Sequence, residues 1–348
     1  MDFDHVHFFV EEAAISAQWF AQRLNLQWLG GLRRNGVRTE YLANGGVRVA
    51  LSSAFEPHNS VATYLTQHPP GVGDLAFQVE DLSASIRCAI ANGATLIQPT
   101  QRQGPVQWAI VSGYQNALQH TLIENKSDRS FWDWVIPELN PLVANDFGRI
   151  DHSVLNVPLG ELQSAIAWYQ SVFGLQARQQ FQIQTPNSGL CSQVLVHPSG
   201  PVCLPINEPT CPNSQIHEFL LHHRGPGIQH LALSTHDLLT TVPQLRRQGL
   251  HFLPVPADYY FNIRSQISPQ FPLPWSAIAE AEILLDCPDP QSSATLLQIF
   301  TQPIFGQPTF FFELIERRAQ AQGFGERNFQ ALFEAIEAEQ LRRTQALA

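Results

Sequence analysis

The feature that most restricts how this chain can fold is an internal repeat. The segment Gly71–Phe77 reads GVGDLAF, and the segment Gly227–Leu233, which begins 156 residues later, reads GIQHLAL. The same offset aligns two further landmarks, namely Asp81-Leu82 with Asp237-Leu238, and Gly93 with Gly249. A register that holds from Gly71 to Gly93 is hard to produce by chance, so we infer two copies of one structural plan.

Both copies begin in the same way. In the first, an alternating strand at residues 3–10 precedes an amphipathic helix that ends at Asn25, a residue that tolerates the left-handed conformation. In the second, a strand at residues 150–155 precedes a helix that ends at Gly174. The apolar faces of these helices are predicted to be Ile15, Trp19, Phe20 and Leu24 in the first, and Leu162, Ile166, Tyr169 and Phe173 in the second.

The repeat predicts the fold class and the domain organisation. We expect an α+β protein with two homologous halves, each made of paired βαβββ modules. A chain of 348 residues exceeds one ordinary compact core, which agrees with two domains. The expected boundaries are residues 1–135 for an N-terminal domain, 136–148 for a proline-punctuated linker, and 149–348 for a C-terminal domain. A last amphipathic helix follows Gly323-Phe324-Gly325, with Phe329, Leu332, Phe333 and Ile336 on its apolar face.

Composition excludes several classes of partner and compartment. The formal net charge of −10 argues against nucleic acid and against an anionic membrane surface, because both require clustered Lys and Arg. The five cysteines are odd in number and form no CxxC pair, which suits reduced thiols in the cytosol. The first residues do not read as a secretory signal, and no run approaches the roughly 18 apolar residues of a membrane span. We therefore expect a cytoplasmic protein without a membrane partner.

Three residues of the second half can hold a metal ion. His152 and His230 lie on predicted strands, and Glu313 lies within the apolar run PTFFFELI, where an unpaired carboxylate would be costly. Two imidazoles and one carboxylate that leave open positions form the ligand set that suits Fe(II) and oxygen chemistry. The spacings of 78 and 83 residues match no short motif such as HExxH. The alternative is a buried, hydrogen-bonded histidine on each strand and a glutamate paired with a nearby arginine.

The first half provides an internal control for this set. It has His5 at the place of His152, but Asp74 stands where His230 would be. Aligning Leu122-Ile123-Glu124 with Leu314-Ile315-Glu316 puts Thr121 opposite Glu313. If the three residues were structural, both halves would need them. Only the second half has the complete set, which favours the metal.

Other conspicuous residues have simpler explanations. His222-His223 lie just before the Gly225-Pro226-Gly227 turn and are expected to end a strand. The pair Arg317-Arg318 is expected to lie on a solvated face or to contact glutamates. Glu316 is expected to be an exposed or salt-bridged neighbour of Glu313.

Several motifs resemble the 4-hydroxyphenylpyruvate dioxygenase family, which lies in the vicinal oxygen chelate superfamily. They are the strand that carries Glu313, GPGIQHLAL at 225–233, LPINEP at 204–209, QIFT at 298–301 and GFGERNF at 323–329. The resemblance covers essentially the whole chain and is densest from residue 149. It implies that the paired modules form open half-barrels and that the last helix acts as a lid on the second.

The resemblance also implies a reaction and a cofactor. One Fe(II) per chain, held by His152, His230 and Glu313, would serve the conversion of 4-hydroxyphenylpyruvate and O2 to homogentisate and CO2. That reaction belongs to tyrosine and phenylalanine catabolism, and in photosynthetic organisms to the route toward plastoquinone and tocopherols. The N-terminal domain would hold no metal and would serve structure or oligomerisation in a homodimer or homotetramer.

Motif by motif, the resemblance implies two groups of substrate-binding side chains. Neutral polar groups would orient the oxo acid or the phenol, namely Ser192, Asn207, Gln215, Gln229 and Gln298. Phenylalanines would enclose the ring, with Phe300 and Phe329 on its two faces and Phe311 and Phe324 completing the wall. One departure is Arg327, which stands where the family usually has a glycine and indicates a stiffer lid hinge.

Three other functions remain open. A 4-hydroxymandelate synthase uses the same substrate and iron but hydroxylates the side chain, whereas Pro205 and Asn207 match the pattern for attack on the ring. An extradiol catechol dioxygenase shares the two-module plan but lacks the C-terminal Phe-Gly and Asn-Phe segment. A non-enzymatic, ligand-sequestering protein of this fold would not require a complete His/His/Glu set.

Overall fold

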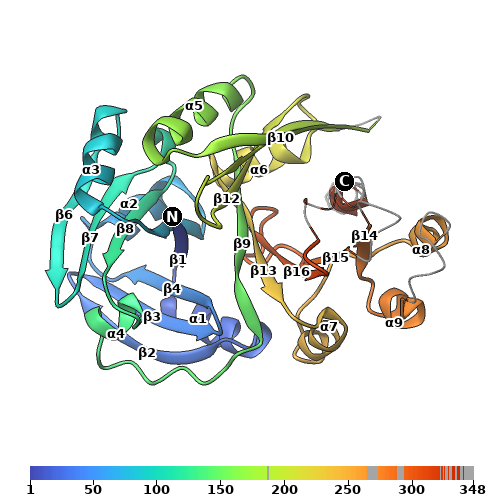
Figure 1. Cartoon of the computed structure of the whole chain (residues 1–348), viewed down its shortest axis with the longest axis horizontal. Coiled ribbons are helices and arrows are strands. Elements are labelled where there is room, and N and C mark those ends of the chain that lie inside the picture. The colour runs from blue at the N-terminus through green and yellow to red at the C-terminus, as the bar shows by residue number, and fades with distance from the viewer. Residues whose placement is uncertain are drawn as a thin grey trace.

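Two eight-stranded sheets with the same topology form the framework of the molecule (Figure 1). This computed structural model describes residues 1–185, 188–264, 273–287 and 294–321, together with residues 323, 325, 328, 331–333, 335–337 and 340. The strand order is β2-β3-β4-β1-β5-β8-β7-β6 in the first sheet and β10-β11-β12-β9-β13-β16-β15-β14 in the second. The two orders are equivalent strand by strand, which confirms the α+β fold of two homologous halves.

The first half comprises the first sheet and the helices that pack on it. Its strands are β1 (Asp2–Phe9), β2 (Gln27–Arg34), β3 (Val37–Asn44), β4 (Val47–Ala54), β5 (Gly71–Gln78), β6 (Leu96–Gln103), β7 (Val106–Ser112) and β8 (Gln119–Asn125). Its helices are α1 (Ala13–Arg23), α2 (Ser60–Gln67), α3 (Leu82–Ala91), the short η1 (Tyr114–Asn116) and α4 (Phe131–Val135). Its two modules meet where β1 pairs with β5.

The second half repeats this plan. Its strands are β9 (Phe147–Asn156), β10 (Gln176–Gln184), β11 (Gly189–Val196), β12 (Cys203–Pro209), β13 (Gly227–Thr235), β14 (Leu284–Asp286), β15 (Thr295–Phe300) and β16 (Phe311–Arg318). Its helices are α5 (Leu162–Phe173), α6 (Gln215–His223), α7 (Leu238–Arg247), α8 (Ala257–Arg264) and α9 (Trp275–Glu280). His222 and His223 form the last turn of α6, so the expectation of a strand end was wrong.

The landmarks of the sequence repeat have the same structural roles in both halves. The Asp81 side chain accepts a hydrogen bond from the backbone N–H of Ala84 and caps α3, and Asp237 caps α7 in the same way through Thr240. Asn25, after α1, has φ 55°, and Gly174, after α5, has φ 66°. Both helices therefore end in the left-handed conformation that the sequence predicted.

The strand registers confirm the alignment that set Thr121 against Glu313. Phe77 of β5 pairs with Leu122 of β8, and its counterpart in the repeat, Leu233 of β13, pairs with Leu314 of β16. Thr121 directly precedes Leu122, and Glu313 directly precedes Leu314. The first half therefore presents a threonine at the sheet position where the second half presents Glu313.

The predicted apolar face of α1 needs one correction. Ile15 is 68% exposed, whereas the predicted residues Phe20 and Leu24 are buried. The buried residues within the helix are Ala13, Ala17 and Phe20. These three positions recur at i, i+4 and i+7, and the two alanines let the helix lie close to the sheet. The face predicted for α5 is confirmed, since Leu162, Ile166, Tyr169 and Phe173 are all buried.

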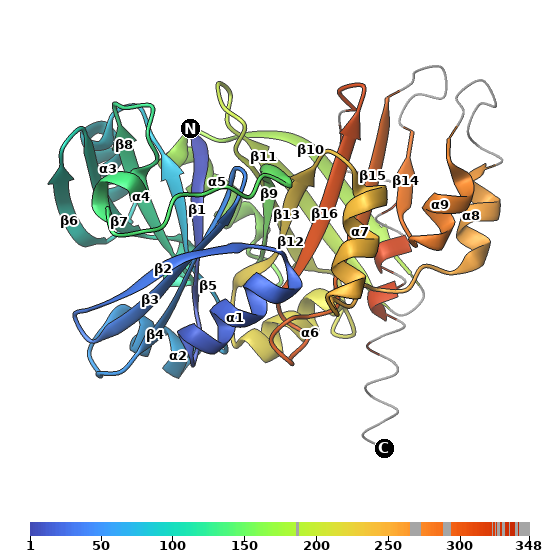
Figure 2. The same cartoon turned by 90° about the horizontal axis from the view of Figure 1, so that it is seen from below.

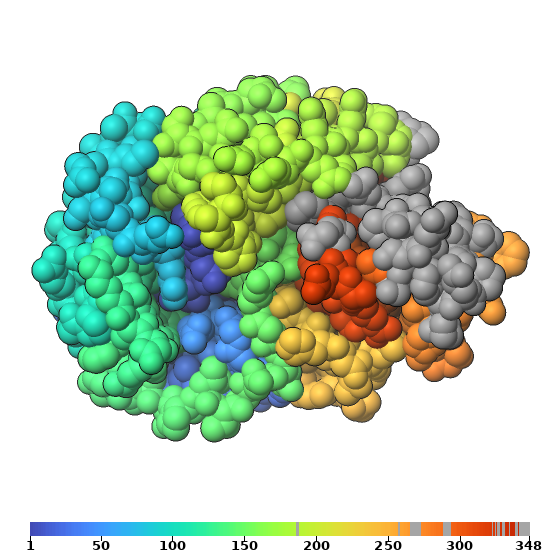
Figure 3. All heavy atoms as spheres, viewed as in Figure 1, coloured from blue at the N-terminus to red at the C-terminus, as the bar shows by residue number. Residues whose placement is uncertain are grey.

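The two sheets lie side by side, with β14 and β15 on the side of the second sheet away from the first half (Figure 2). Helix α5 bridges the halves along one edge, where it packs against α3 (Figure 3). The Cys88 thiol of α3 donates to the Ser171 carbonyl oxygen of α5 across this contact, at 3.1 Å. In the described part of the chain, no helix is long and apolar enough to cross a membrane.

The described residues near the C-terminus pack onto the second sheet. Residues 328, 331–333, 335–337 and 340 are helical. Leu332 and Ile336 pack with Phe300 and Phe311, and Phe333 packs with other residues over the pocket described below. The predicted residues Phe324, Arg327 and Phe329 lie outside the described residues. The helix therefore covers the face of the second sheet that bears the candidate ligands.

Candidate metal centre

The three candidate ligands lie on adjacent strands at the centre of the second sheet. Ala232 of β13 pairs with His152 of β9 on one side and with Glu313 of β16 on the other. His230 lies two residues from Ala232 along β13, and residues two apart in a strand share a face. The pairing of three strands thus brings together side chains that are 78 and 83 residues apart in sequence.

The distances between the donor atoms fit one metal ion. Glu313 Oε2 lies 3.2 Å from His152 Nε2 and 3.7 Å from His230 Nε2. One donor atom from each residue lies within 4.8 Å of the others, and all three residues are buried. Ligand atoms bound at about 2.1 Å and at right angles to each other are about 3 Å apart. Among the described residues this is the single cluster of three such side chains.

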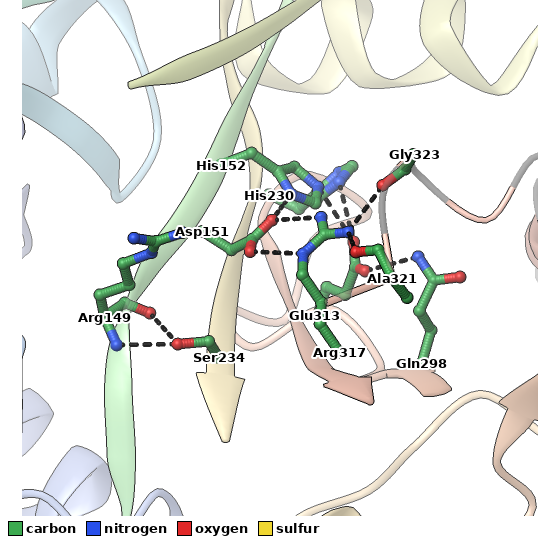
Figure 4. Close-up of polar contacts among 10 residues, drawn as sticks. All are labelled: Arg149, Asp151, His152, His230, Ser234, Gln298, Glu313, Arg317, Ala321 and Gly323. Atoms are coloured by element: carbon green, nitrogen blue, oxygen red, sulfur yellow. Dashed lines mark hydrogen bonds and ion pairs between the residues drawn. The ribbon is translucent and has the colours of Figure 1, made fainter. Parts of the chain in front are cut away.

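Neighbouring side chains orient the candidate ligands His152 and Glu313. The Nδ1 of His152 donates to Asp151 Oδ1 at 3.0 Å, which leaves Nε2 directed toward Glu313. Asp151 also accepts two hydrogen bonds from Arg317, at 2.8 and 2.9 Å (Figure 4). On the other side, the Gln298 amide donates to Glu313 Oε1 at 2.8 Å. A carboxylate that fixes the remote nitrogen of a histidine is a common arrangement around bound metals.

His230 is held by a ring and an amide. Its ring stacks on Phe311, with centroids 4.8 Å apart and planes inclined by 19°. Its Nδ1 donates to Gln229 Oε1 at 3.3 Å, and Phe300 approaches edge-on at 6.4 Å. These contacts direct Nε2 of this ring, too, toward Glu313.

The electrostatics of the cluster favour a bound cation. Burial disfavours a charged His152, but the carboxylates of Glu313 and Asp151 outweigh burial and raise the pKa of this histidine to about 9. Burial and the charge of His152 hold the pKa of His230 well below its usual range. Burial would also raise the pKa of Asp151, yet the contacts from Arg317 and His152 lower it. A divalent cation at the same point would replace the proton on His152.

A pocket opens beside the ligands. It is lined by His152 and His230 together with Val154, Phe181, Ile183, Leu190, Ser192, Pro205, Asn207, Gln215, Ile216, Gln229, Leu332, Phe333 and Ile336. Four of the five predicted polar substrate residues are in this lining. Gln215 Oε1 is buried and accepts no hydrogen bond from the described residues, so it is available to a ligand.

The other predicted substrate residues have different surroundings. Gln298 lies beside Glu313 and does not line the pocket. It donates to Glu313 and accepts from the Asn328 amide, each at 2.8 Å. Phe311 and Phe300 contact His230, and neither belongs to the lining of the pocket. Phe324 and Phe329 lie outside the described residues.

Sequence reasoning missed Asp151 and Arg317. The expectation that Arg317 is solvated or contacts a glutamate was wrong, since its guanidinium binds Asp151, whereas Arg318 does contact Glu316. A signal for Asp151 was available, because an aspartate precedes the histidine in both halves, as Asp4-His5 and Asp151-His152. No local signal pointed to Arg317, whose partner is 166 residues away in sequence.

In the first half the equivalent positions bind each other. Asp74, at the place of His230, accepts hydrogen bonds from the backbone N–H and the hydroxyl of Thr121. Burial raises the pKa of Asp74, and the two bonds from Thr121 oppose that shift. The rings of Phe131 and Trp132 lie over His5. The acid and the hydroxyl satisfy each other, which accounts for a buried polar pair without a cation.

Comparisons with known proteins agree with the fold. Residues 149–271 match the model of the Glyoxalase/Bleomycin resistance protein/Dioxygenase superfamily. The chain is 38% identical over 286 residues to a 4-hydroxyphenylpyruvate dioxygenase of Legionella pneumophila, which covers 82% of this chain and 80% of that protein. It is 32% identical over 367 residues to a 4-hydroxyphenylpyruvate dioxygenase of Caenorhabditis elegans, covering 98% and 92% of the two chains.

A solved structure shows the same architecture. A mutant 4-hydroxymandelate synthase from Streptomyces coelicolor superimposes with a TM-score of 0.85 at 25% sequence identity. The match covers 97% of this chain and 98% of the other. It therefore includes both halves.

Proposed function

The chain belongs to the 4-hydroxyphenylpyruvate dioxygenase family, and from this premise we propose that it is an Fe(II) enzyme with His152, His230 and Glu313 as its metal ligands. The reaction is the conversion of 4-hydroxyphenylpyruvate and O2 to homogentisate and CO2, with one iron ion per chain. The observation that carries the proposal is the buried cluster of two imidazoles and one carboxylate within 4.8 Å. Bound Fe(II) would supply open coordination positions and redox chemistry toward O2.

The chain's own residues account for substrate binding. Among the residues that the structure describes, the pocket lining contains no lysine or arginine, so the bound metal is what would offset the charge of the substrate's carboxylate. Neutral side chains remain to orient the oxo acid and the phenol, namely Ser192, Asn207, Gln215 and Gln229. Pro205, Phe181 and Ile216 offer apolar walls, which exclude water from the reacting atoms.

The C-terminal helix would close this pocket. Leu332, Phe333 and Ile336 form part of the lining and come from the last helix, whereas the ligands come from the sheet. A helix that lines a pocket and is joined to the sheet through glycines can act as a lid. Gly323 and Gly325, with φ 88° and 72°, stand at this junction.

We assign the first half, residues 1–135, a structural role, with residues 136–148 as the linker to the catalytic domain at 149–348. Strand β9 begins at Phe147, inside the proposed linker. The Asp74–Thr121 pair supports this division of labour, because it removes two ligand positions from the first half.

Product analysis tests the proposed reaction directly. Protein reconstituted with Fe(II) without oxygen and given 4-hydroxyphenylpyruvate and then O2 is expected to yield homogentisate and CO2. A yield of 4-hydroxymandelate instead would identify a synthase, the function named for the solved structure above. Binding of 4-hydroxyphenylpyruvate without O2 uptake would identify a ligand-sequestering protein.

Glu313→Ala tests the metal ligand. Because Glu313 is the sole carboxylate of the cluster, the variant is expected to lose tight Fe(II) binding and turnover while its circular dichroism stays that of the parent. Metal content after desalting and O2 uptake are the measurements. Full activity in this variant would refute the ligand assignment. Glu316→Ala, three residues further along β16, is the control and should retain the metal.

A further inference from the structure

Arg317 joins the metal ligands to the start of the C-terminal segment. It lies near the end of β16, four residues after Glu313. Its Nε and one terminal nitrogen donate to the two oxygens of Asp151, and its other terminal nitrogen donates to the carbonyl oxygens of Ala321 at 3.2 Å and Gly323 at 2.8 Å (Figure 4). One planar guanidinium therefore holds a side chain and two backbone groups at once.

The carboxylate bound by Arg317 is the one that orients His152. Asp151 Oδ1 accepts from His152 Nδ1 as well as from Arg317. Three consecutive hydrogen-bonded steps thus connect the carbonyl groups of Ala321 and Gly323 to His152, through Arg317 and Asp151. The Asp151 side chain is 6% exposed and that of Arg317 is 23% exposed, so solvent weakens these contacts little.

The first half contains the equivalent Asp–His pair without an arginine bound to the aspartate. There the pair of Asp4 and His5 persists at 2.7 Å, with Gln78 donating to the other oxygen of Asp4. Asn125 occupies the sheet position of Arg317, and its amide donates to the Arg129 carbonyl oxygen instead. An arginine is therefore not required to bury the Asp–His pair. It occurs in the half that has both the ligand cluster and a C-terminal helix.

A second link reaches the same segment from the ligand on the other side. Gln298 donates to Glu313 and accepts from Asn328, in the first described turn of the C-terminal helix. The hydroxyl of Tyr259 donates to Asn328 Oδ1 at 2.7 Å. The segment that leaves β16 is thus tied to the surroundings of His152 and of Glu313.

We propose that Arg317 is a positioning residue that couples the seating of the C-terminal segment to the orientation of the metal ligand His152. The inference rests on the proposed metal site. When Ala321 and Gly323 are seated, the guanidinium is held on two sides and fixes Asp151, which fixes the imidazole. When they move away, Arg317 loses two of its acceptors and Asp151 its fixed partner. Coupling of this kind is reciprocal, so metal binding stabilises the seated segment.

Cobalt binding and hydrogen exchange test the coupling without recourse to turnover. Wild-type protein is titrated with Co(II), followed by its visible absorption, and hydrogen exchange is measured over residues 319–340 with and without Co(II). We expect Co(II) to slow exchange in the wild type. In Arg317→Gln we expect affinity for Co(II) to fall roughly 10- to 100-fold, the range for residues that orient metal ligands, and the slowing to vanish.

Two further variants separate this role from a general structural one. Arg318→Gln removes the neighbouring arginine, which contacts Glu316 instead, and is expected to keep both Co(II) affinity and the slowing. Arg317→Lys keeps the charge beside Asp151. A single ammonium group cannot, however, bind both oxygens of Asp151 and also reach the carbonyl oxygens of Ala321 and Gly323. It is expected to fold and to lose the metal-dependent slowing even if Arg317→Gln does not fold.

The outcomes distinguish this inference from the proposed function. If the wild type does not bind Co(II), the proposed metal site fails, and the coupling with it. If the wild type binds Co(II) and the metal slows exchange equally in wild type, Arg317→Lys and Arg317→Gln, the metal site stands and the coupling is overturned. Loss of the slowing in Arg318→Gln to the same extent would overturn it as well.

Discussion

At Glu313 a single carboxylate meets three partners, namely the Nε2 atoms of His152 and His230 and the amide of Gln298. No sequence feature near Glu313 predicted these partners. The comparison of the two halves did identify the set, because Thr121 and Asp74 stand at two of the three places in the first half. A repeat with diverged chemistry thus indicated candidate ligands that spacing alone could not. Their role as ligands stays a prediction until metal binding is measured.

The side chains around the ligands were harder to predict. The expectation that Gln298 contacts substrate stays a prediction, and the structure adds that its amide donates to Glu313 and its carbonyl oxygen accepts from Asn328. Asp151 and Arg317 were not anticipated as a pair, since strand pairing across the sheet decides which side chains meet. A residue's neighbours two strands away are set by register, and register is a property of the folded sheet.

Gln215→Met tests the polar side of the pocket. The buried Oε1 of Gln215 has no partner among the described residues, so a substrate hydrogen bond there is worth about 1–1.5 kcal/mol. We expect the variant to bind 4-hydroxyphenylpyruvate about tenfold more weakly and to keep its metal affinity. Titration of the metal-loaded protein with substrate without O2 measures this. Gln193→Met is the control, because Gln193 bonds the Gln179 carbonyl and does not line the pocket; equal weakening there would contradict the assignment.

At the scale of single elements, the same cap is found in both halves: a glutamate of the sheet accepts a hydrogen bond from the first residue of a helix. The backbone N–H of Leu82, at the start of α3, donates to Glu124 at 2.9 Å, and that of Leu238, at the start of α7, donates to Glu316 at 2.7 Å. Glu316 also contacts Arg318 and is buried, so the expectation of a salt bridge was right and that of exposure wrong. The pattern of apolar residues around Glu316 could not predict that its carboxylate accepts a hydrogen bond from the first residue of α7.

Helices and strands followed the periodicity of the sequence, with errors where small residues decided the packing. The strands that carry the candidate ligands and the face of α5 were predicted correctly. In α1 the larger residue Ile15 was preferred over Ala13 and Ala17, although alanines are what allow a helix to approach a sheet closely. The helical end at His222 and His223 was missed because the following turn suggested a strand.

Gly325→Ala tests the seating of the C-terminal segment. Gly325 has φ 72°, and a Cβ built there would overlap Gln298 Oε1, so either the segment or the Gln298 side chain that contacts Glu313 must shift. We expect turnover to fall tenfold or more, while the free energy of unfolding falls by about 1–2 kcal/mol. The control is Gly306→Ala, since Gly306 has φ 71° but open space around its Cβ position. If both variants lost turnover equally, backbone strain rather than contact with Gln298 would be the cause.

At the scale of the whole molecule, neutral histidines join the two halves. The Tyr64 hydroxyl of α2 donates to His223 Nε2 of α6 at 3.2 Å. The Tyr169 hydroxyl of α5 donates to His120 Nε2 of β8 at 3.1 Å, and His120 Nδ1 donates to the Leu75 carbonyl. Each histidine can accept its tyrosine hydrogen only when it is unprotonated. The fold of each half was predictable from the repeat, but this junction was not, because it depends on how the halves dock.

The junction predicts acid sensitivity. Burial lowers the pKa of His120 to about 4 and that of His223 to about 3, below the usual value near 6.5. The unfolded chain therefore binds protons that the folded chain does not, and stability present above pH 6.5 is lost as the pH falls toward 4. Each histidine contributes up to about 1.4 kcal/mol per pH unit to that loss.

Comparison of His120→Gln with wild type isolates one histidine. Denaturant unfolding of metal-free protein at pH 7 and pH 5 gives the free energies of unfolding. The variant is expected to be less stable at pH 7 but to lose less stability on acidification, by up to about 2 kcal/mol over this interval. An identical loss in both proteins would show that His120 does not remain neutral in the fold.

The matched strand order of the two sheets has a consequence for engineering. His5, Asp74 and Thr121 occupy the sheet positions of His152, His230 and Glu313, so the double substitution Asp74→His and Thr121→Glu would complete a second ligand set on an existing frame. The rings of Phe131 and Trp132 already lie over His5, where the second half has an open pocket. Such a graft would bind metal without room for an aromatic substrate. One molecule would then carry a metal site with a substrate pocket and a metal site without one. The effect of metal binding on stability could be measured at the second site without catalysis.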